Sequence, residues 1–273
     1  MVTDLTSAEA HFEFGKNWQD YLRHVDEAAI GEAERGLLKL LPAESLRGAR
    51  FLDIGCGSGL HTLAAVRAGI AEGVAIDIDR DSVAATRELL AKLAPDAPVE
   101  VRELSIFDAD SAALGQFDVV YSWGVLHHTG AMWRAIEKAA TLVRPGGLFV
   151  LALYQRRITC GAWRVEKKLY TRAPGAIRAL IRGLYTGAVY AGHAVRGRNP
   201  WKVVREYKSS RGMNFHNDVH DWLGGYPYES ATPQEVQSKV CAMGFERVAD
   251  YPLAPGLGLF GTGCAEYVFR RTA

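Results

Sequence analysis

The sequence predicts an α/β fold, a mostly parallel sheet with helices on both faces. Three observations predict it. An apolar run at 51–54 leads directly into Gly55, Gly57 and Gly59, and a helical pattern follows. A second apolar run ends in an acid, Asp77. Strand-length apolar runs then alternate with helical patterns as far as residue 154, as expected of a parallel sheet built from strand–helix–strand units.

The glycines occupy the turn after the first strand. Glycine has no Cβ, so the turn is sharp and a ligand can lie against bare backbone. The free N–H groups of the next helix start face that ligand. A P-loop would need Gly-Lys-Ser/Thr here, and Gly59 is followed by Leu60 and His61. A dinucleotide fingerprint would need a third glycine at position 60. The pattern is Gly-x-Gly-x-Gly after an acid, Asp53.

Asp77 follows the glycines at about the 20-residue spacing expected of a carboxylate that binds ribose hydroxyls. Asp79 is also within reach, and we prefer Asp77 because it lies directly at the strand end. These features indicate a nucleoside cofactor. They do not exclude NAD as that cofactor.

Three more strands are expected, at 99–101, 117–122 and 148–154. Ligands bind outside the carboxyl ends of parallel strands. His127 and His128 follow the fourth strand, so they lie where reacting atoms are expected. A catalytic or substrate-contacting role and a structural role are about equally supported for this pair. Asp108, after the third strand, either lies near the ligand or caps a short helix.

Four stretches resemble, in order, motifs of class I S-adenosylmethionine (SAM) dependent methyltransferases. They are the acid and glycines at 53–59, the acid at 77, Trp-Gly-Val-Leu-His-His at 123–128 and Leu-Val-Arg-Pro-Gly-Gly-Leu-Phe at 142–149. The turn at 122–125 is not the Asn/Asp-Pro-Pro-aromatic motif frequent in enzymes that methylate base or protein amines. The resemblance implies a seven-stranded Rossmann-like sheet with an antiparallel last strand and a helical insert between strands five and six.

The same resemblance implies SAM as the cofactor. Asp53 would help to hold the methionine part, Asp77 the ribose, and Ser105 and Ile106 would lie along the adenine. The residues expected to contact SAM are Asp53, Gly55, Cys56, Gly57, Gly59, Asp77, Ile78, Ser105, Ile106, Ser122, Trp123 and Trp18.

The insert is strongly basic. Residues 155–211 hold fourteen Lys and Arg against two acids, a charge of +12, so the remainder of the +1 chain carries −11. Such asymmetry suggests an anionic partner. Apolar residues from Ile177 to Val189 share a helical face, with Arg178 and Arg182 beside them. The helix either packs on the core with solvated arginines, touches anionic lipid, or forms a basic wall for a phosphorylated or lipid-linked substrate. We do not expect nucleic acid, because no recognition motif accompanies the charge.

Residues 211–230 crowd titratable groups among aromatic ones. Spacings of three and four place His216 with His220, and Asp218 with Asp221, on neighbouring helical positions. Histidine beside a carboxylate is a suitable general base. The stretch Asp-Trp-Leu-Gly-Gly-Tyr-Pro resembles the tail of a group of bacterial SAM methyltransferases. That group often has a histidine directly before the aspartate, where this chain has Asn217, which favours Asp218. The candidate catalytic residues are His128, Asp218, His220, His127, Asp221 and His216.

We expect one methyltransferase domain over 1–273, with a helical lid at 1–45 and a basic helical cap over the substrate at 155–230. Residues 8–41 are predicted to be mostly helix, and packing against the domain is the alternative to a lid. Thr232 and Glu235 predict a capping box. Two alternating stretches, 246–251 and 266–270, predict an antiparallel hairpin that completes the sheet.

The composition limits the classes of protein to which this chain can belong. The hydrophobic share is 48%, ordinary for a globular core. The sequence has no apolar run long enough for a membrane span, and the N-terminus lacks the features of a signal peptide. The four cysteines are far apart without a CxxC pair, which argues against a zinc site and against a disulfide framework. A cytoplasmic protein, with contact to the inner membrane face through the insert, is the expectation.

The predicted function is SAM-dependent methyl transfer to a small molecule or glycan, at a hydroxyl. A nicotinamide-dependent oxidoreductase shares the fold and Asp77, and the missing glycine and the Pro-Gly-Gly motif disfavour it. A non-catalytic SAM-binding or membrane-associated protein is the third class, and the intact motifs and polar cluster argue against it. The acceptor and the oligomeric state do not follow from the sequence.

Overall fold

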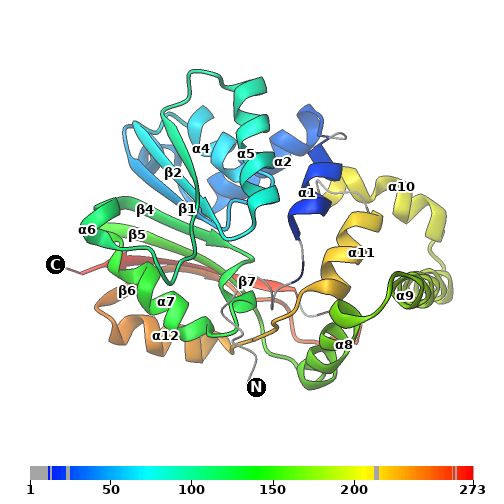
Figure 1. Ribbon diagram of the computed structural model, residues 1–273. Coiled ribbons are helices and arrows are strands. Elements are labelled where there is room, and N and C mark those ends of the chain that lie inside the picture. The colour runs from blue at the N-terminus through cyan, green and yellow to red at the C-terminus, as the bar shows by residue number, and fades with distance from the viewer. Residues whose placement is uncertain are drawn as a thin grey trace.

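The computed structural model describes residues 12, 14–22, 25–211, 215–259, 261 and 263–272 of the 273-residue chain. A seven-stranded sheet runs through it in the order β3-β2-β1-β4-β5-β7-β6 (Figure 1). Its strands are β1 (Arg50–Ile54), β2 (Glu72–Asp77), β3 (Val99–Glu103), β4 (Phe117–Trp123), β5 (Val143–Tyr154), β6 (Phe245–Tyr251) and β7 (Cys264–Arg271).

The strand directions confirm the predicted fold class. β3, β2, β1, β4 and β5 are parallel, while β7 pairs antiparallel with both β5 and β6. Leu52 of β1 lies between Val74 and Val120 of its neighbours. Strands covered on both faces read as near-continuous apolar runs, which is why the sequence marks the central strands clearly.

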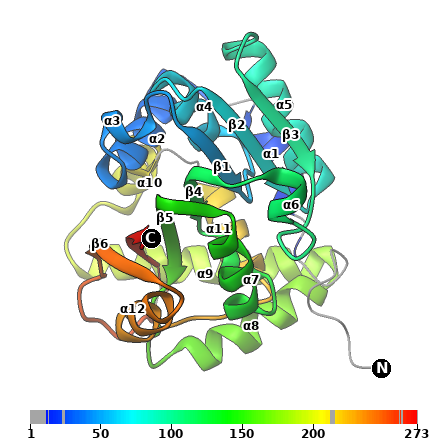
Figure 2. The same cartoon turned by 90° about the vertical axis from the view of Figure 1, so that its left-hand side faces the viewer.

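Helices cover both faces of the sheet (Figures 1 and 2). Phe51 packs on one face against the helices α2, α3 and α4, and Leu52 packs on the other face among residues of α7 and α12. α5 packs beside α4 over β2 and β3. The helices are α2 (Glu27–Leu40), α3 (Ala43–Leu46), α4 (Leu60–Arg67), α5 (Arg80–Leu93), α6 (Ser111–Leu114), α7 (Met132–Thr141) and α12 (Pro233–Ala242).

Four helices lie between β5 and β6 and form a separate layer beside the sheet (Figure 1). They are α8 (Cys160–Arg172), α9 (Gly175–Val195), α10 (Pro200–Arg211) and α11 (Phe215–Gly224). Their own apolar core holds Tyr170, Phe215, Val219 and Leu223, and Phe12 joins it from the N-terminal segment. The insert therefore has a core distinct from those on the two sheet faces.

The described N-terminal residues are mostly helical, as predicted, and form two helices. α1 (Phe14–Leu22) ends before Asp26, whose side chain accepts a hydrogen bond from the N–H of Ala29 at 3.0 Å and caps α2. An N-cap of this kind starts a new helix. α1 contacts both α5 and α11, so it bridges the sheet layer and the insert. The capping box of Thr232 and Glu235 is confirmed, with both hydrogen bonds present.

Gly15 lets α1 sit against the start of α5. Its N–H donates to Asp79 Oδ2 at 2.8 Å, and a Cβ at Gly15 would lie 2.5 Å from Asp79 Oδ1 and 2.6 Å from the backbone N of Ser82. We expect Gly15→Ala to lower the free energy of unfolding by about 1–3 kcal/mol, because overpacking forces the two helices apart. Denaturant unfolding measures the change.

Gly36→Ala is the matched control, because Gly36 is also helical and a Cβ there meets nothing within 4 Å. It should raise stability by about 0.5–1 kcal/mol. Equal effects of the two substitutions would contradict the docking of α1 on α5.

Candidate functional site

The turn between β1 and α4 is held open by glycines with left-handed backbone. Gly55 has a φ of 76° and Gly57 a φ of 54°, values that side chains rarely allow. The N–H groups of Gly55 and Cys56 both donate to the carbonyl of Ile76, at 2.7 and 3.1 Å. The turn is thereby fixed to the carboxyl end of β2 and presents backbone, not side chains, to a ligand.

Asp77 joins this turn to the end of β2. Its Oδ2 accepts from the N–H of Gly57 at 3.1 Å and its Oδ1 from that of Asp79 at 2.9 Å. Burial raises the pKa of Asp77 to about 6, although these hydrogen bonds oppose the shift. The Asp79 carboxylate is engaged with α1 and α5, since it accepts from the N–H groups of Gly15 and Asp81.

The indole of Trp18 lies over the glycine turn. A Cβ on Gly57 would come within 3.1 Å of Trp18 Nε1, so the two groups are in van der Waals contact across bare backbone. α1 thus covers the turn. This geometry places Trp18, Gly57 and Asp77 together, and their role in binding a cofactor stays a prediction.

Asp53 is a second acid beside the turn, and it is more buried than the half-buried Asp77. It is 3% exposed, and its Oδ2 accepts from Thr62 Oγ1 at 2.6 Å. Burial raises the pKa of Asp53 to about 7, and the Asp77 carboxylate raises it further against the Thr62 hydrogen bond. No basic side chain of the described residues pairs with Asp53 or Asp77. A buried carboxylate beside a half-buried one, without a cation, suits a cationic ligand.

The other predicted cofactor residues are already engaged by the protein. Ser122 Oγ donates to the carbonyl of Ile54 at 3.1 Å, and Trp123 Nε1 donates to Glu266 Oε1 at 2.9 Å, which turns the indole toward β7. Cys56 Sγ accepts from Thr86. The remaining members are Ile78, half-buried after β2, Ser105, whose Oγ accepts from the N–H of Phe107, and Ile106, which packs in the core.

The two predicted histidines lie at the carboxyl end of β4 in different surroundings. His127 is wholly buried; its Nδ1 accepts from the N–H of Tyr154 at 3.4 Å, and its Nε2 has no partner among the described residues. Burial, then His128 and Lys167, lowers the pKa of His127 well below its usual value. His128 Nδ1 lies 2.7 Å from the carbonyl of Pro227, so that nitrogen carries the proton.

The candidate base residues of α11 divide between two environments. His220 Nδ1 lies 2.7 Å from the Tyr170 hydroxyl and 3.3 Å from Arg182 Nη1, inside the helical insert. Burial lowers the pKa of His220 to about 4, and the charges of Arg182 and Arg178 lower it as well. Asp218 accepts from the Tyr207 hydroxyl, and Asp221 raises the pKa of Lys167. The side chain of His216 lies outside the described residues.

An aromatic cluster around Tyr154 contains residues that the sequence analysis did not select. The Tyr154 ring lies 3.9 Å from that of His127, 5.4 Å from Trp222 and 5.2 Å from Tyr228. Lys167 is fully buried, with Nζ 3.7 Å from the centre of the Trp222 ring. The spacing Trp163, Lys167, Tyr170 on one helical face was the available signal, a lysine on an aromatic stripe.

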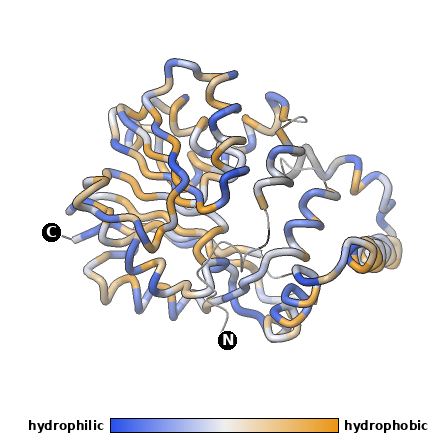
Figure 3. Tube along the Cα trace, viewed as in Figure 1, coloured by the Kyte–Doolittle hydropathy of each residue, from blue (hydrophilic) through white to orange (hydrophobic). Residues whose placement is uncertain are grey.

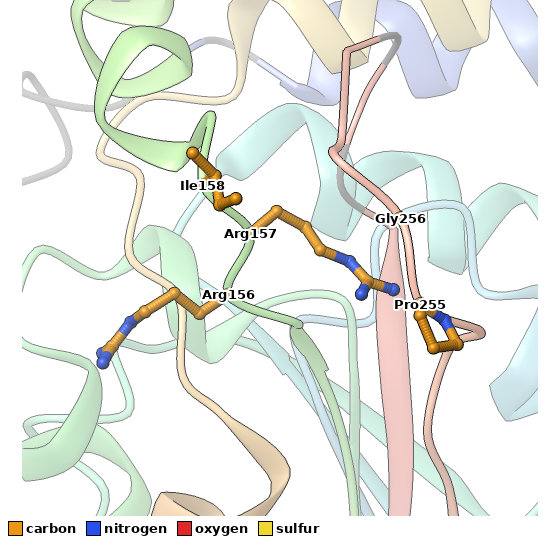
Figure 4. Close-up of a pocket in the computed structure, with 5 residues that line it drawn as sticks. All are labelled: Arg156, Arg157, Ile158, Pro255 and Gly256. Carbon is orange, nitrogen blue, oxygen red and sulfur yellow. The ribbon is translucent and has the colours of Figure 1, made fainter.

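The hollow shown in Figure 4 is not this site. It has a volume of about 480 Å³ and is lined by Arg156, Arg157, Ile158, Pro255 and Gly256. Both arginines are engaged: Arg156 pairs with Glu235 at 2.7 Å and Arg157 donates to the carbonyl of Ala254 at 2.6 Å. Over the described part of the chain, no group of three His, Cys, Asp or Glu could hold a metal ion.

Comparison with known proteins agrees with this geometry. Residues 52–149 match the family model described as a methyltransferase domain. A ubiquinone biosynthesis O-methyltransferase of Xanthomonas campestris is 36% identical over 112 residues, 41% of this chain and 46% of the relative. One of Bordetella avium is 34% identical over 105 residues, 38% of this chain and 42% of that protein. The chain thus matches less than half the length of these relatives.

Solved structures share the fold over most of the chain. Magnesium protoporphyrin IX methyltransferase of Synechocystis with bound S-adenosylhomocysteine has a TM-score of 0.55 at 14% identity, covering 90% of this chain and 84% of that one. A SAM-dependent methyltransferase of Mesorhizobium loti has a TM-score of 0.52 at 18% identity, covering 88% and 98%. These likenesses show a common fold.

The buried acid Asp53 predicts a pH-dependent stability. Its folded pKa is about 7 against an ordinary 3.8, so the folded protein keeps a proton that the unfolded chain has lost. Stability is therefore lost as pH rises through this window. We expect ligand-free Asp53→Asn to unfold at nearly the same temperature as the wild type at about pH 4 and at a higher temperature at about pH 8. Scanning calorimetry across the window measures this.

Asp118→Asn is a control of opposite sign. Burial of Asp118 is outweighed by hydrogen bonds from the N–H of Arg50 and from Arg144, so its pKa is lowered. This carboxylate stabilises the fold above the unfolded pKa, and Asp118→Asn should lose stability there. A difference for Asp53→Asn that stays constant with pH would contradict the burial of an unpaired carboxylate.

Proposed function

We propose that this chain, a SAM-dependent methyltransferase, transfers the methyl group of SAM to a hydroxyl oxygen of a small-molecule acceptor. The observation that carries the choice of cofactor is Asp53, a buried acid beside the glycine turn with no basic partner among the described residues. SAM carries a sulfonium and an ammonium group. The pyrophosphate of NAD is anionic and would be repelled by this carboxylate, so the charge of the site disfavours a nicotinamide cofactor.

The residues present fit SAM. The Trp18 indole lies directly on the bare backbone at Gly57, so a ligand on the turn would take the place of the indole there. Asp77, fixed by two N–H donors, would hold the ribose hydroxyls, and Asp53 would face the cationic methionine part. We propose that α1 acts as the lid, because Trp18 lies over the turn and Gly15 anchors the helix on α5.

Methyl transfer requires alignment more than activation. Bound SAM supplies an electrophilic methyl group, which an acceptor oxygen displaces in line from sulfur. Holding the acceptor in line contributes roughly 7–11 kcal/mol, and a hydroxyl also needs a base, because its pKa is far above neutral. We propose that the insert α8–α11 caps the acceptor, since Trp222 of α11 contacts Tyr154 at the carboxyl end of β5. Transfer to oxygen is supported by the names of the relatives.

Loss of the ribose carboxylate should weaken SAM binding. Asp77→Asn leaves one oxygen for two N–H donors. The substitution therefore weakens both the hydrogen bonds that fix the turn and the proposed contact with the ribose. We expect the Kd for SAM to rise about tenfold or more, a loss of about 1.4 kcal/mol. Isothermal titration calorimetry with SAM, and in parallel with NAD, measures it.

Asp110→Asn is the control, because Asp110 is an exposed cap of the short helix α6. This variant should bind SAM as the wild type does. Tighter binding of NAD than of SAM, or full SAM affinity in Asp77→Asn, would overturn the assignment of the cofactor.

We further propose that α9 rests on an anionic lipid surface. The arginines of α9 face the protein and its apolar residues face outward. A helix packed on the core by its apolar face, with solvated arginines, would have the opposite orientation. Arg178 turns inward and donates to the carbonyls of Ala173 and Thr171, and Arg182 donates to the Tyr170 hydroxyl. The exposed positions of α9 are Gly175, Ala176, Ile177, Ala179, Leu180, Gly183, Leu184, Gly187, Ala188, Ala191, Ala194 and Val195.

This outer face is apolar along the whole helix, and Leu180 and Leu184 are 62% and 67% exposed. It lies at the edge of the molecule farthest from the sheet (Figures 1 and 3). Exposed basic residues adjoin it on α8, after α9 and on α10: Arg164, Lys168, Arg172, Arg196, Arg198, Lys202 and Arg205. No acid is exposed among the described side chains of these helices. An apolar face with a basic border suits anionic headgroups.

Helices in the described part of the chain are too short or too polar to cross a bilayer, so the proposed contact is with its surface. We expect the purified protein to sediment with phosphatidylglycerol-containing vesicles and less with pure phosphatidylcholine. Leu180→Glu/Leu184→Glu should reduce the bound fraction about tenfold, because two charges enter the apolar face.

Leu38→Glu, an exposed leucine on α2 at 43%, is the matched control and should bind vesicles normally. Equal binding of the double variant and the wild type would contradict the proposal. A wild-type dimer that is absent in the double variant would also contradict it, since a second copy of the chain would then cover this face.

A further inference from the structure

The hollow beside the start of α8 lies at the edge of the sheet where ligands are expected. Its arginines, Arg156 and Arg157, come shortly after Tyr154, the last residue of β5. Ligands of open parallel sheets bind outside the carboxyl ends of the strands. The volume of about 480 Å³ is within the roughly 300–1,000 Å³ of small-molecule sites. The residues that line the hollow include no acid.

Arg157 supplies the positive charge of this hollow. Figure 4 shows its side chain extending toward Pro255 and Gly256, while Arg156 extends the opposite way and pairs with Glu235. Within the described part of the chain, the only side-chain hydrogen bond of Arg157 runs from Nη2 to a backbone carbonyl at 2.6 Å. That partner is neutral, so no acid there compensates the charge of Arg157, and most of its N–H donors remain unused.

The loop between β6 and β7 has its carbonyl groups occupied by side chains from the start of α8. Thr159 Oγ1 donates to the carbonyl of Leu257 at 3.0 Å, and Trp163 Nε1 donates to that of Gly258 at 2.7 Å. Carbonyl oxygens repel an anion, because both are hydrogen-bond acceptors. These bonds hold the loop against α8 and engage the acceptors that would oppose an anionic ligand.

Two residues of the lining have backbone N–H groups without a protein partner. Ile158 and Gly256 lie outside the helices and strands, and their N–H groups donate to no atom of the described residues. Phosphate oxygens accept strong hydrogen bonds from the planar guanidinium fork and from backbone N–H groups. The lining therefore offers the donors and the charge that a phosphate group requires.

We propose that this hollow binds the phosphate group of a ligand, with the Arg157 guanidinium and the N–H groups of Ile158 and Gly256 as donors. Phosphate binding goes beyond the proposed methyl transfer and does not depend on it. A water-soluble phosphate ester and the headgroup of a phospholipid carry the same group. Ile158, which is 86% exposed, offers an apolar contact to the organic part of either ligand.

Gly256 allows the charge of the hollow to be changed without overpacking. A Cβ there meets nothing within 4 Å, and the backbone is not left-handed. Gly256→Glu adds an acid close to Arg157, and Gly256→Gln adds a side chain of the same shape without the charge. Gly36→Glu on α2 is the charge-matched control outside the hollow, because a Cβ at Gly36 also meets nothing within 4 Å.

Titration calorimetry of the full-length protein with glycerol 3-phosphate tests the site with a soluble ester. We expect Gly256→Glu to raise the Kd about tenfold or more by repulsion. Arg157→Gln should raise it about as much, because it removes charge-assisted hydrogen bonds. Gly256→Gln and Gly36→Glu should change it less than about twofold. Each variant should bind SAM as the wild type does, which shows that the fold is intact.

Sedimentation of the same variants with phosphatidylglycerol vesicles distinguishes the source of the phosphate. Weaker binding of glycerol 3-phosphate by Gly256→Glu than by Gly256→Gln and Gly36→Glu supports a soluble ester. The same difference seen with vesicles alone supports a lipid headgroup. Absence of binding of both ligands by the wild type, or equal behaviour of Gly256→Glu and Gly36→Glu toward both, would overturn the proposed site.

Discussion

The backbone of the turn after β1 is the constraint on which the site depends. Gly55 and Gly57 take left-handed conformations, and Gly57 also lies in contact with Trp18 where a Cβ would intrude. Because the turn carries no side chain at these points, its N–H groups can reach the carbonyl of Ile76 and the carboxylate of Asp77. The same absence lets the Trp18 indole of α1 lie against the turn. The positions of α1 and of Asp77 both follow from this turn.

Charge distinguishes the two sides of this region. Asp77 raises the pKa of the buried Asp53, and no basic side chain of the described residues pairs with either acid. A buried carboxylate without a cationic partner costs stability, so Asp53 does not contribute to the stability of the fold as a charged group. Toward the insert the pattern changes: Lys167 and His127 are nitrogen groups among aromatic rings. The acidic side complements the cationic cofactor that we propose.

The sequence predicts the sheet well and the insert poorly, for physical reasons. The strands are marked by runs buried on both faces, and Asp77 by its fixed distance from the glycines, so local pattern is sufficient. Lys167 is different, because its significance comes from Trp222, 55 positions away on another helix, a meeting that only tertiary packing creates. The inward orientation of Arg178 does not follow from the sequence either. Periodicity identifies the two faces of a helix, but it does not show which face is covered.

A crystal structure with S-adenosylhomocysteine is the most direct test. We expect the adenosyl group against Gly55–Gly59, its ribose hydroxyls on Asp77 and Trp18 closed over it. A nucleoside bound elsewhere on the sheet would contradict the proposed cofactor site.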